Sequence, residues 1–263
     1  MGLVDRLRRL VTPAPPVARG AAGARAYAIG DVHGRLDLLD RLLGTIQADI
    51  AARPERRIFL VLLGDLIDRG PASAGVVERL RTFRPDGVNM VFLAGNHEEV
   101  MLRVLKGEEG VLPSWLKFGG AECLESYGVD AEALKRLDET AAIARIQAAV
   151  PAKHVAFLSS FNDTFRFGDY LFVHAGIRPG LPIEDQHVKD LRWIREPFLG
   201  DAKEHGFIVV HGHTICEGVE ERSNRIGIDT GAYLSGNLTS IAIEDERRWF
   251  LATGDDGDGP YRS

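Results

Sequence analysis

Residues 58–70 have the sequence IFLVLLGDLIDRG, in which six apolar residues are followed by a glycine and an acidic turn. A similar order, a mainly apolar run followed by a glycine and a polar residue, occurs in residues 27–31, with the sequence YAIGD, and in residues 88–96, with the sequence VNMVFLAGN. A short apolar run that ends at a glycine-containing turn is typical of a buried β-strand. The three segments therefore predict three buried strands, each with a polar turn at its carboxyl end.

Segments with helical periodicity separate these predicted strands. Residues 39–50 place leucine and isoleucine at the spacing of one helix face, and Val76, Val77 and Leu80 follow the same spacing. Strands that alternate with helices about every 30 residues form a largely parallel sheet with right-handed crossovers. The carboxyl ends of parallel strands share one edge of the sheet, which is where ligands bind. We therefore expect all three polar turns at that edge.

The rest of the chain predicts a helical insertion and a second sheet. Residues 99–165 have a mostly helical pattern interrupted by proline and glycine. The predicted fold class is α/β, a two-sheet mixed β-sandwich flanked by helices. We expect a flexible arm at residues 1–25, one domain at residues 26–252 and a disordered tail at residues 253–263. Short apolar runs predict a mostly antiparallel or mixed second sheet from residues 170–173, 207–210, 225–228, 238–243 and 249–252.

The composition is that of an ordinary globular protein and argues against several classes. Of the 263 residues, 45% are hydrophobic and 27% are charged. The net charge of −6 opposes binding to phosphate polymers, so a nucleic-acid partner is not expected. The longest aliphatic and aromatic run covers only residues 58–63. A membrane span needs about 20 such residues, so none is expected.

The N-terminal region and the cysteines predict a cytoplasmic protein. Leu10 and Val11 run directly into Pro13, so no apolar signal-peptide core is sustained. Cys123 and Cys216 lack zinc-binding spacing and form at most one disulfide, which suits a reducing compartment. No pattern in the sequence indicates an oligomeric state.

The polar turns carry side chains of the types that bind divalent metals. An aspartate after a strand is commonly a helix cap, and a single histidine is commonly a structural group. Several strand ends that all carry ligand-type residues, in an order that places them along one sheet edge, instead predict a metal centre. Mixed carboxylate, amide and imidazole ligands favour Mn, Fe or Zn over Ca or Mg. The candidate ligands are Asp31, His33, Asp65, Asn96, His174 and His213.

The ordered motifs resemble those of the phosphoprotein phosphatase family of the calcineurin-like metallophosphoesterases, particularly its bacterial and phage members. One motif alone is weakly specific, but the ordered set is specific and covers roughly residues 26–245. The motifs are Gly30-Asp31-x-His33-Gly34, Gly64-Asp65-x-x-Asp68-Arg69-Gly70, Gly95-Asn96-His97-Glu98, His174-Ala175-Gly176 and Gly212-His213-Thr214, with Trp115-Leu116, Gly119-Gly120, Trp193-Ile194-Arg195-Glu196 and Asp229-Thr230-Gly231-Ala232 beyond them.

The resemblance implies two divalent cations, with Mn as the expected metal and Fe or Zn as alternatives. Asp31 and His33 match ligands of the first metal, and Asp65 matches the carboxylate that bridges both. Asn96, His174 and His213 match ligands of the second metal. His211 lies two residues before His213, on the same face of an extended chain, so a further ligand there stays open. The family pattern favours a packing role for it.

The resemblance also implies the catalytic groups. His97 matches the histidine that protonates the leaving oxygen, and Asp68 matches the acid that orients it. Arg69 and Arg195 match the two arginines that grip the phosphoryl oxygens. Arg192 lies three residues from Arg195 on one helical face, so it is an alternative for the second position. These roles suit phosphoryl transfer, whose transition state carries charge on three equatorial oxygens.

The expected function is that of a metal-dependent phosphomonoester hydrolase, a serine/threonine protein phosphatase that uses in-line attack by a hydroxide bridging two cations. A phosphorylated protein or peptide is then the substrate. The alternative is a diadenosine tetraphosphatase of the same superfamily, and a silent scaffold that binds phosphoproteins is a third hypothesis. Asp68, Glu98 and Thr214 favour the protein phosphatase, because the tetraphosphatases tend to carry Ala, Asp and Trp at these positions.

Overall fold

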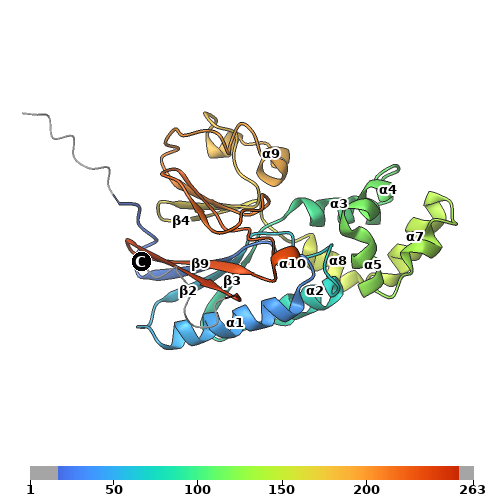
Figure 1. Cartoon of the computed structure of the whole chain (residues 1–263), viewed down its shortest axis with the longest axis horizontal. Coiled ribbons are helices and arrows are strands. Elements are labelled where there is room, and N and C mark those ends of the chain that lie inside the picture. Colours follow the sequence, from blue (N-terminus) through green and yellow to red (C-terminus); the bar gives the residue numbers. More distant parts are fainter. Residues whose placement is uncertain (1–16, 255–263) are drawn as a thin grey trace, which may run out of the picture.

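The computed structural model describes residues 17–254 and contains two five-stranded sheets packed face to face (Figure 1). The first sheet has the order β10-β9-β1-β2-β3. Strands β1, β2 and β3 are parallel to one another, as their apolar runs predict, β9 is antiparallel to β1, and the edge strand β10 is antiparallel to β9. The strands are β1 (Ala24–Ile29), β2 (Arg57–Leu62), β3 (Val88–Phe92), β9 (Thr239–Glu244) and β10 (Arg247–Ala252).

The second sheet has the order β4-β5-β6-β8-β7 and is mixed, so the predicted two-sheet α/β architecture is confirmed. The prediction that residues 238–243 and 249–252 belong to this sheet is wrong. They form β9 and β10 of the first sheet, because β9 pairs with β1 and is buried along its whole length. The members are β4 (Thr164–Phe167), β5 (Tyr170–Val173), β6 (Ile208–His211), β7 (Glu220–Glu221) and β8 (Arg225–Gly227).

Each face of the first sheet has its own core. One face packs on α1 (Leu36–Ala51) and α2 (Ser73–Thr82), whose apolar sides supply much of a large cluster with residues of β1 and β2. The opposite face contributes Ala28, Val61 and Ile241 to a cluster with Phe172 and Val210 of the second sheet. Figure 1 shows these helices along one side of the first sheet and the second sheet on the other. This packing fixes the relative position of the strand ends from both sheets.

The stretch between β3 and β4 is mostly helical, and its helices gather at one end of the molecule (Figure 1). A parallel bridge between Leu93 and Asn162 closes this stretch onto the sheet. Two short helices, α9 (Val188–Trp193) and α10 (Ala232–Ser235), lie later in the chain. The helical elements of the stretch are α3 (Asn96–Leu105), α4 (Leu112–Trp115), η2 (Leu116–Gly120), α5 (Ala121–Ser126), α6 (Ala131–Leu134), α7 (Glu139–Ala149) and α8 (Ala152–Leu158).

The predicted boundary of the N-terminal arm needs a correction at one end. Strand β1 begins at Ala24, and the Arg25 side chain is buried against Glu244 of β9, so residues 24 and 25 belong to the sheet. The remainder of the predicted arm up to residue 16, and the predicted tail from residue 255, lie outside the described residues. Among the helices formed by residues 17–254, none has the length and apolar character required to span a bilayer.

Candidate metal centre

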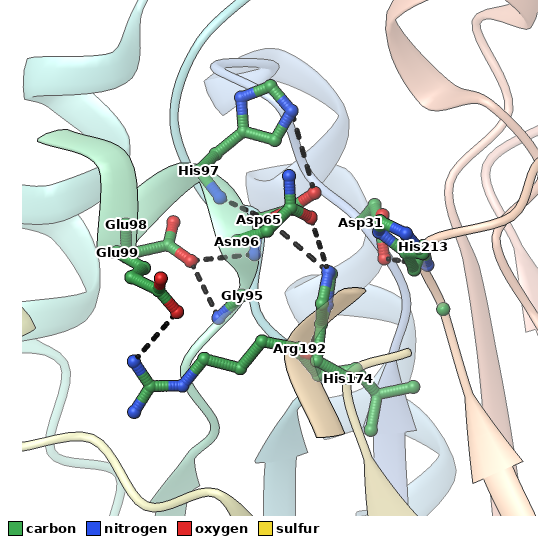
Figure 2. Close-up of polar contacts among 12 residues, drawn as sticks. Asp31, Asp65, Gly95, Asn96, His97, Glu98, Glu99, His174, Arg192 and His213 are labelled. Atoms are coloured by element: carbon green, nitrogen blue, oxygen red, sulfur yellow. Dashed lines mark hydrogen bonds and ion pairs between the residues drawn. The ribbon is translucent and has the colours of Figure 1, made fainter. Parts of the chain in front are cut away.

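The candidate ligands meet where strand ends of both sheets approach one another (Figure 2). Asp31 and His33 follow β1, Asp65 follows β2, His174 follows β5 and His213 follows β6, and all five side chains are buried. Asn96 begins α3 at the end of β3 and is buried beside them. The sequence prediction that these turns share one edge is therefore met by the structure.

The backbone of these turns adopts an unusual conformation. His33, Asp65, Asp68, Arg69 and His213 all have positive φ, which side chains other than glycine rarely adopt. Such strain clusters at functional sites, where the surrounding structure holds it in place. Among the described residues, the sixth non-glycine residue with positive φ is in the hairpin between β9 and β10.

Asp65 belongs to two groups of potential metal ligands. His33, Asp65 and His97 form one group, and Asp65, His174 and His213 form the other. Within each group the ligand atoms lie within 4.8 Å of one another, and every residue is buried. A carboxylate common to two such groups is placed to bridge two cations.

The histidine tautomers leave lone pairs pointing into the centre. Nδ1 of His174 donates to the Leu63 carbonyl at 2.9 Å, and burial lowers the pKa of His174, so Nε2 carries no proton. That Nε2 lies 3.0 Å from Asn96 Oδ1 and 3.4 Å from Asp65 Oδ1. Nδ1 of His33 likewise donates to the Ile67 carbonyl at 2.8 Å, and burial lowers the pKa of His33 to about 3. Several acceptors thus converge, which a cation would stabilise.

The buried carboxylates also lack sufficient positive charge within the chain. Burial raises the pKa of Asp31 well above its ordinary value, and the nearby charges of Asp229 and Asp65 add to this shift. Burial raises the pKa of Asp229 to about 6. His213 Nε2 is buried without a hydrogen-bond partner among the described residues. This donor set fits divalent cations, which would balance the carboxylates and use the free imidazole nitrogen.

Two predicted ligands have particular surroundings. Asp31 lies outside both groups, and its carboxylate accepts the backbone N–H of His213 at 3.0 and 3.2 Å (Figure 2). Its role as a ligand stays a prediction. Asn96 Oδ1 faces His174 and is thereby placed with the second group. His211 is buried against Phe198, with ring centroids 5.2 Å apart, and lies outside both groups, which agrees with a packing role.

His97 is held by a buried hydrogen-bond chain. Its Nδ1 donates to Asp68 Oδ2 at 2.6 Å, and Trp115 Nε1 donates to the same oxygen at 2.9 Å. Burial lowers the pKa of His97, but the charges of Asp65 and Asp68 outweigh burial, so the pKa is raised overall. Nε2 remains directed toward the centre and lies 3.1 Å from Arg69 Nη2. The imidazole is therefore oriented, with Nδ1 as donor to Asp68 and Nε2 as acceptor of the Arg69 N–H.

The arginines differ in how they are held. The Arg69 backbone N–H donates to the Gly119 carbonyl at 3.1 Å, and its guanidinium lies over the Tyr233 ring. Arg195 is exposed and donates to the His213 carbonyl at 3.4 Å. Arg192 is instead paired with Asp163 and Glu99. Arg192 and Arg195 are the two candidates for the second phosphate-binding position. Arg195 lies beside the candidate ligand His213, and it has no carboxylate partner among the ion pairs of the described residues.

A family model for calcineurin-like phosphoesterases matches residues 24–233 of the chain, which include every candidate ligand and arginine described above. The chain belongs to this family. The likeness of the motifs, stated from the sequence alone, is thus confirmed at the family level.

Relatives of the phosphoesterase include enzymes named for different substrates. The bis(5'-nucleosyl)-tetraphosphatase PrpE [asymmetrical] of Bacillus subtilis is 28% identical over 241 residues, which is 82% of this chain and 90% of the relative. Serine/threonine-protein phosphatase 1 of Salmonella typhimurium is 27% identical over 229 residues, covering 83% of this chain and 91% of the relative. Both matches extend over most of the two chains compared.

Solved structures share the fold of the phosphoesterase at low sequence identity. A structure described as that of a proposed diadenosine tetraphosphatase matches with a TM-score of 0.63 and 20% identity, covering 91% of this chain and 100% of the other. The cold-active protein-tyrosine phosphatase of a Shewanella species matches with a TM-score of 0.56 and 17% identity, covering 90% and 82%. At these identities the matches establish the fold and no finer property.

Several residues outside the ligand set support the centre. Glu98 accepts the backbone N–H groups of Asp65 and Leu66 at 2.9 and 2.7 Å, which fixes the turn that carries the shared carboxylate. Burial raises the pKa of Glu98 to about 7. Trp115 stood in a quoted motif, but its hydrogen bond to Asp68 spans 47 positions and depends on the fold. Asp229 accepts the backbone N–H of Gly231, two residues further along the chain.

Proposed function

We propose that this phosphoesterase is a two-metal hydrolase of dinucleoside tetraphosphates. The observation that carries the metal-dependent hydrolase is the sharing of Asp65 by two buried groups of ligand atoms. The substrate is supported by the relatives, because PrpE and a symmetrical bis(5'-nucleosyl)-tetraphosphatase of Methylobacillus flagellatus both match over more than 80% of this chain. The protein phosphatase expected from the sequence thereby becomes the second candidate, and the diadenosine tetraphosphatase, stated there as the alternative, becomes the first.

The proposed metal-binding residues have separate tasks. Asp65 would be shared by both cations, and Asp31 and His33 would complete the first site, with His97 of the same group reserved for proton transfer. Asn96, His174 and His213 would complete the second site. Two bound cations would polarise the phosphoryl oxygens and supply a nucleophile at neutral pH. Expected metals are Mn, with Fe or Zn as alternatives, because their ligand preferences match this set.

The remaining residues act on the phosphate and on the leaving group. Arg69 and Arg195 bind the phosphoryl oxygens and stabilise their charge in the transition state. His97 holds a proton at Nε2 for the departing oxygen, because Asp68 fixes Nδ1 as the other donor. Trp115 keeps the Asp68 carboxylate in place through its hydrogen bond.

A phosphoprotein is the second candidate substrate. It is supported by the match to serine/threonine-protein phosphatase 1, which covers 83% of this chain, compared with 82% for the match to PrpE. Asp68 and Glu98 also agree with the pattern of the protein phosphatases described above.

A single comparison tests the proposal. Metal-stripped protein is reconstituted with Mn²⁺ and assayed on diadenosine tetraphosphate and on a phosphoserine/phosphothreonine peptide, with Asp65→Asn as the inactive control. We expect a higher kcat/KM for the dinucleotide. Preference for the peptide would replace the proposed substrate by the second candidate, and no hydrolysis of either would contradict the hydrolase and revive the scaffold hypothesis.

A further inference from the structure

A pocket of about 740 Å³ opens beside the metal centre. Its lining includes Arg69 and Tyr233, together with Arg35, Asp37 and Asp40 near the start of α1. Arg69 contacts His97, and the Tyr233 ring lies 5.3 Å from the His33 ring between centroids. The pocket is therefore directly continuous with the side chains around the candidate catalytic histidine.

We propose that this pocket binds one nucleoside of the substrate, with the base packed against Tyr233. This inference rests on the proposed function and specifies which part of the chain selects a nucleotide. Tyr233 is half-buried and offers an aromatic surface, and the Arg69 guanidinium lies 4.7 Å from its ring centroid. Aromatic rings and arginine planes are the surfaces on which nucleobases stack.

The charged residues of the pocket favour phosphates at Arg69 and leave the neighbouring Tyr233 ring for the base. Arg69 supplies positive charge at the inner end, beside the centre. Arg35 supplies little to a ligand, because its guanidinium is paired with Asp37 at 2.7 Å and donates to the Ala232 carbonyl. Asp37 is neutralised by the same pair and Asp40 by Arg79 at 2.6 Å, so this part of the pocket offers no free positive charge to further phosphates, whereas the carboxylate oxygens can accept hydrogen bonds from the amino group of a base.

One wall of the pocket is formed by the strained turn after β2. Gly70 and Pro71 line the pocket directly after Arg69. A side chain at position 70 would collide with the backbone of His33 and Gly34, so the turn is packed against the first candidate metal site. Phe118 is a second aromatic residue near Arg69, since its neighbour Gly119 packs on Arg69, but it is 65% exposed and outside the pocket lining. It provides a matched control.

The test compares a substrate that has nucleosides with one that lacks them. Kinetics of Tyr233→Leu, Tyr233→Phe and Phe118→Leu are measured on diadenosine tetraphosphate and on inorganic tetraphosphate. Stacking on an aromatic ring changes binding by about 5- to 100-fold. We expect Tyr233→Leu to raise KM for the dinucleotide by about that factor relative to KM for inorganic tetraphosphate. Tyr233→Phe keeps the ring and should restore the wild-type ratio, and Phe118→Leu should not change it.

Equal KM changes on both substrates in Tyr233→Leu would overturn the inference, because they would show a purely structural role near Arg69 and His33. An altered ratio in Phe118→Leu alone would also overturn it. Both outcomes leave dinucleotide hydrolysis by the wild type intact, whereas a wild type that prefers the peptide removes the proposed function and this inference together. Titration calorimetry of the wild type gives an independent check: adenosine monophosphate should bind at least about fivefold more tightly than inorganic phosphate, and equal affinities would contradict the nucleoside site.

Discussion

The two ends of strand β1 bury charge in opposite ways. At its start, Arg25 is completely buried and its Nε donates to Glu244 Oε2 at 2.5 Å, so the chain neutralises its own charge. Directly after its end, Asp31 is buried with Asp65 and Asp229, and the pKa of Asp31 is raised by burial and by these like charges. One end is electrostatically complete in the protein alone, and the other end is suited to cations.

Asp65→Asn should have the largest effect on the end of the strand that is suited to cations. The amide keeps the size of the side chain but removes the charge shared by both ligand groups. We expect metal binding to be lost and hydrolysis to fall to background, a larger effect than the about 10–100-fold caused by losing an outer hydrogen bond to a ligand. Metal analysis and kcat/KM measure this, with the exposed Glu132→Gln as control. Retained activity would refute the bridging role.

His97→Asn tests whether this buried histidine serves proton transfer. We expect bound metal to be retained, while kcat falls by about 10²–10⁴-fold on phenyl phosphate. The loss should be smaller on 4-nitrophenyl phosphate, because its leaving group is less basic and needs the proton less. Equal losses on both substrates would remove the assignment of His97 as the proton donor.

Arg25→Met tests the other end of β1. The substitution leaves the buried Glu244 carboxylate with only the exposed Arg247 as an ionic partner, so the free energy of unfolding should fall by up to about 3–5 kcal/mol. Adding Glu244→Leu should recover most of this loss. Arg19→Met is the matched control, since Arg19 pairs with Glu246 at the surface and its loss should cost less than about 1 kcal/mol. Urea unfolding measures all three variants. An unchanged free energy of unfolding in Arg25→Met would contradict the view that Arg25 neutralises the buried charge at the start of β1.

Asp229→Asn tests whether the buried carboxylates destabilise the folded chain when no metal is bound. The pKa of Asp229 in the folded chain is about 6, above the ordinary 3.8, so folding opposes its ionised form. The resulting destabilisation is absent below about pH 4 and grows as the pH rises through about 6. The variant should therefore be more stable than the wild type by about 1–3 kcal/mol at pH 8 and equal to it at pH 4. Urea unfolding in chelator checks this, and an equal gain at both pH values would contradict it.

The sequence predicts local features of this molecule better than long-range pairings. Asp31, Asp65 and Asn96 follow apolar strands, and the shared edge of parallel strands brings such turns together. Residues 238–243 were assigned to the wrong sheet because an apolar run indicates burial but not the neighbouring strand. Arg25 was assigned to the arm, since its partner Glu244 is 219 positions away.

The candidate site shows the same limit. The motifs contain Asp68 and Trp115, but only the fold brings the indole to the carboxylate across 47 positions. Tyr233 directly follows the motif Asp229-Thr230-Gly231-Ala232, but the motif assigns it no role. It becomes a candidate for substrate contact only because α10 places its ring beside Arg69 and His33.

The carboxyl ends of β1 and β2 are proposed to form a two-metal site that is built on Asp65. Titration calorimetry of Mn²⁺ into the metal-stripped wild type and into Asp65→Asn tests it most directly. The account predicts two ions bound per wild-type chain and loss of this binding in the variant. Absence of binding to the wild type, or unchanged stoichiometry and affinity in Asp65→Asn, would contradict it.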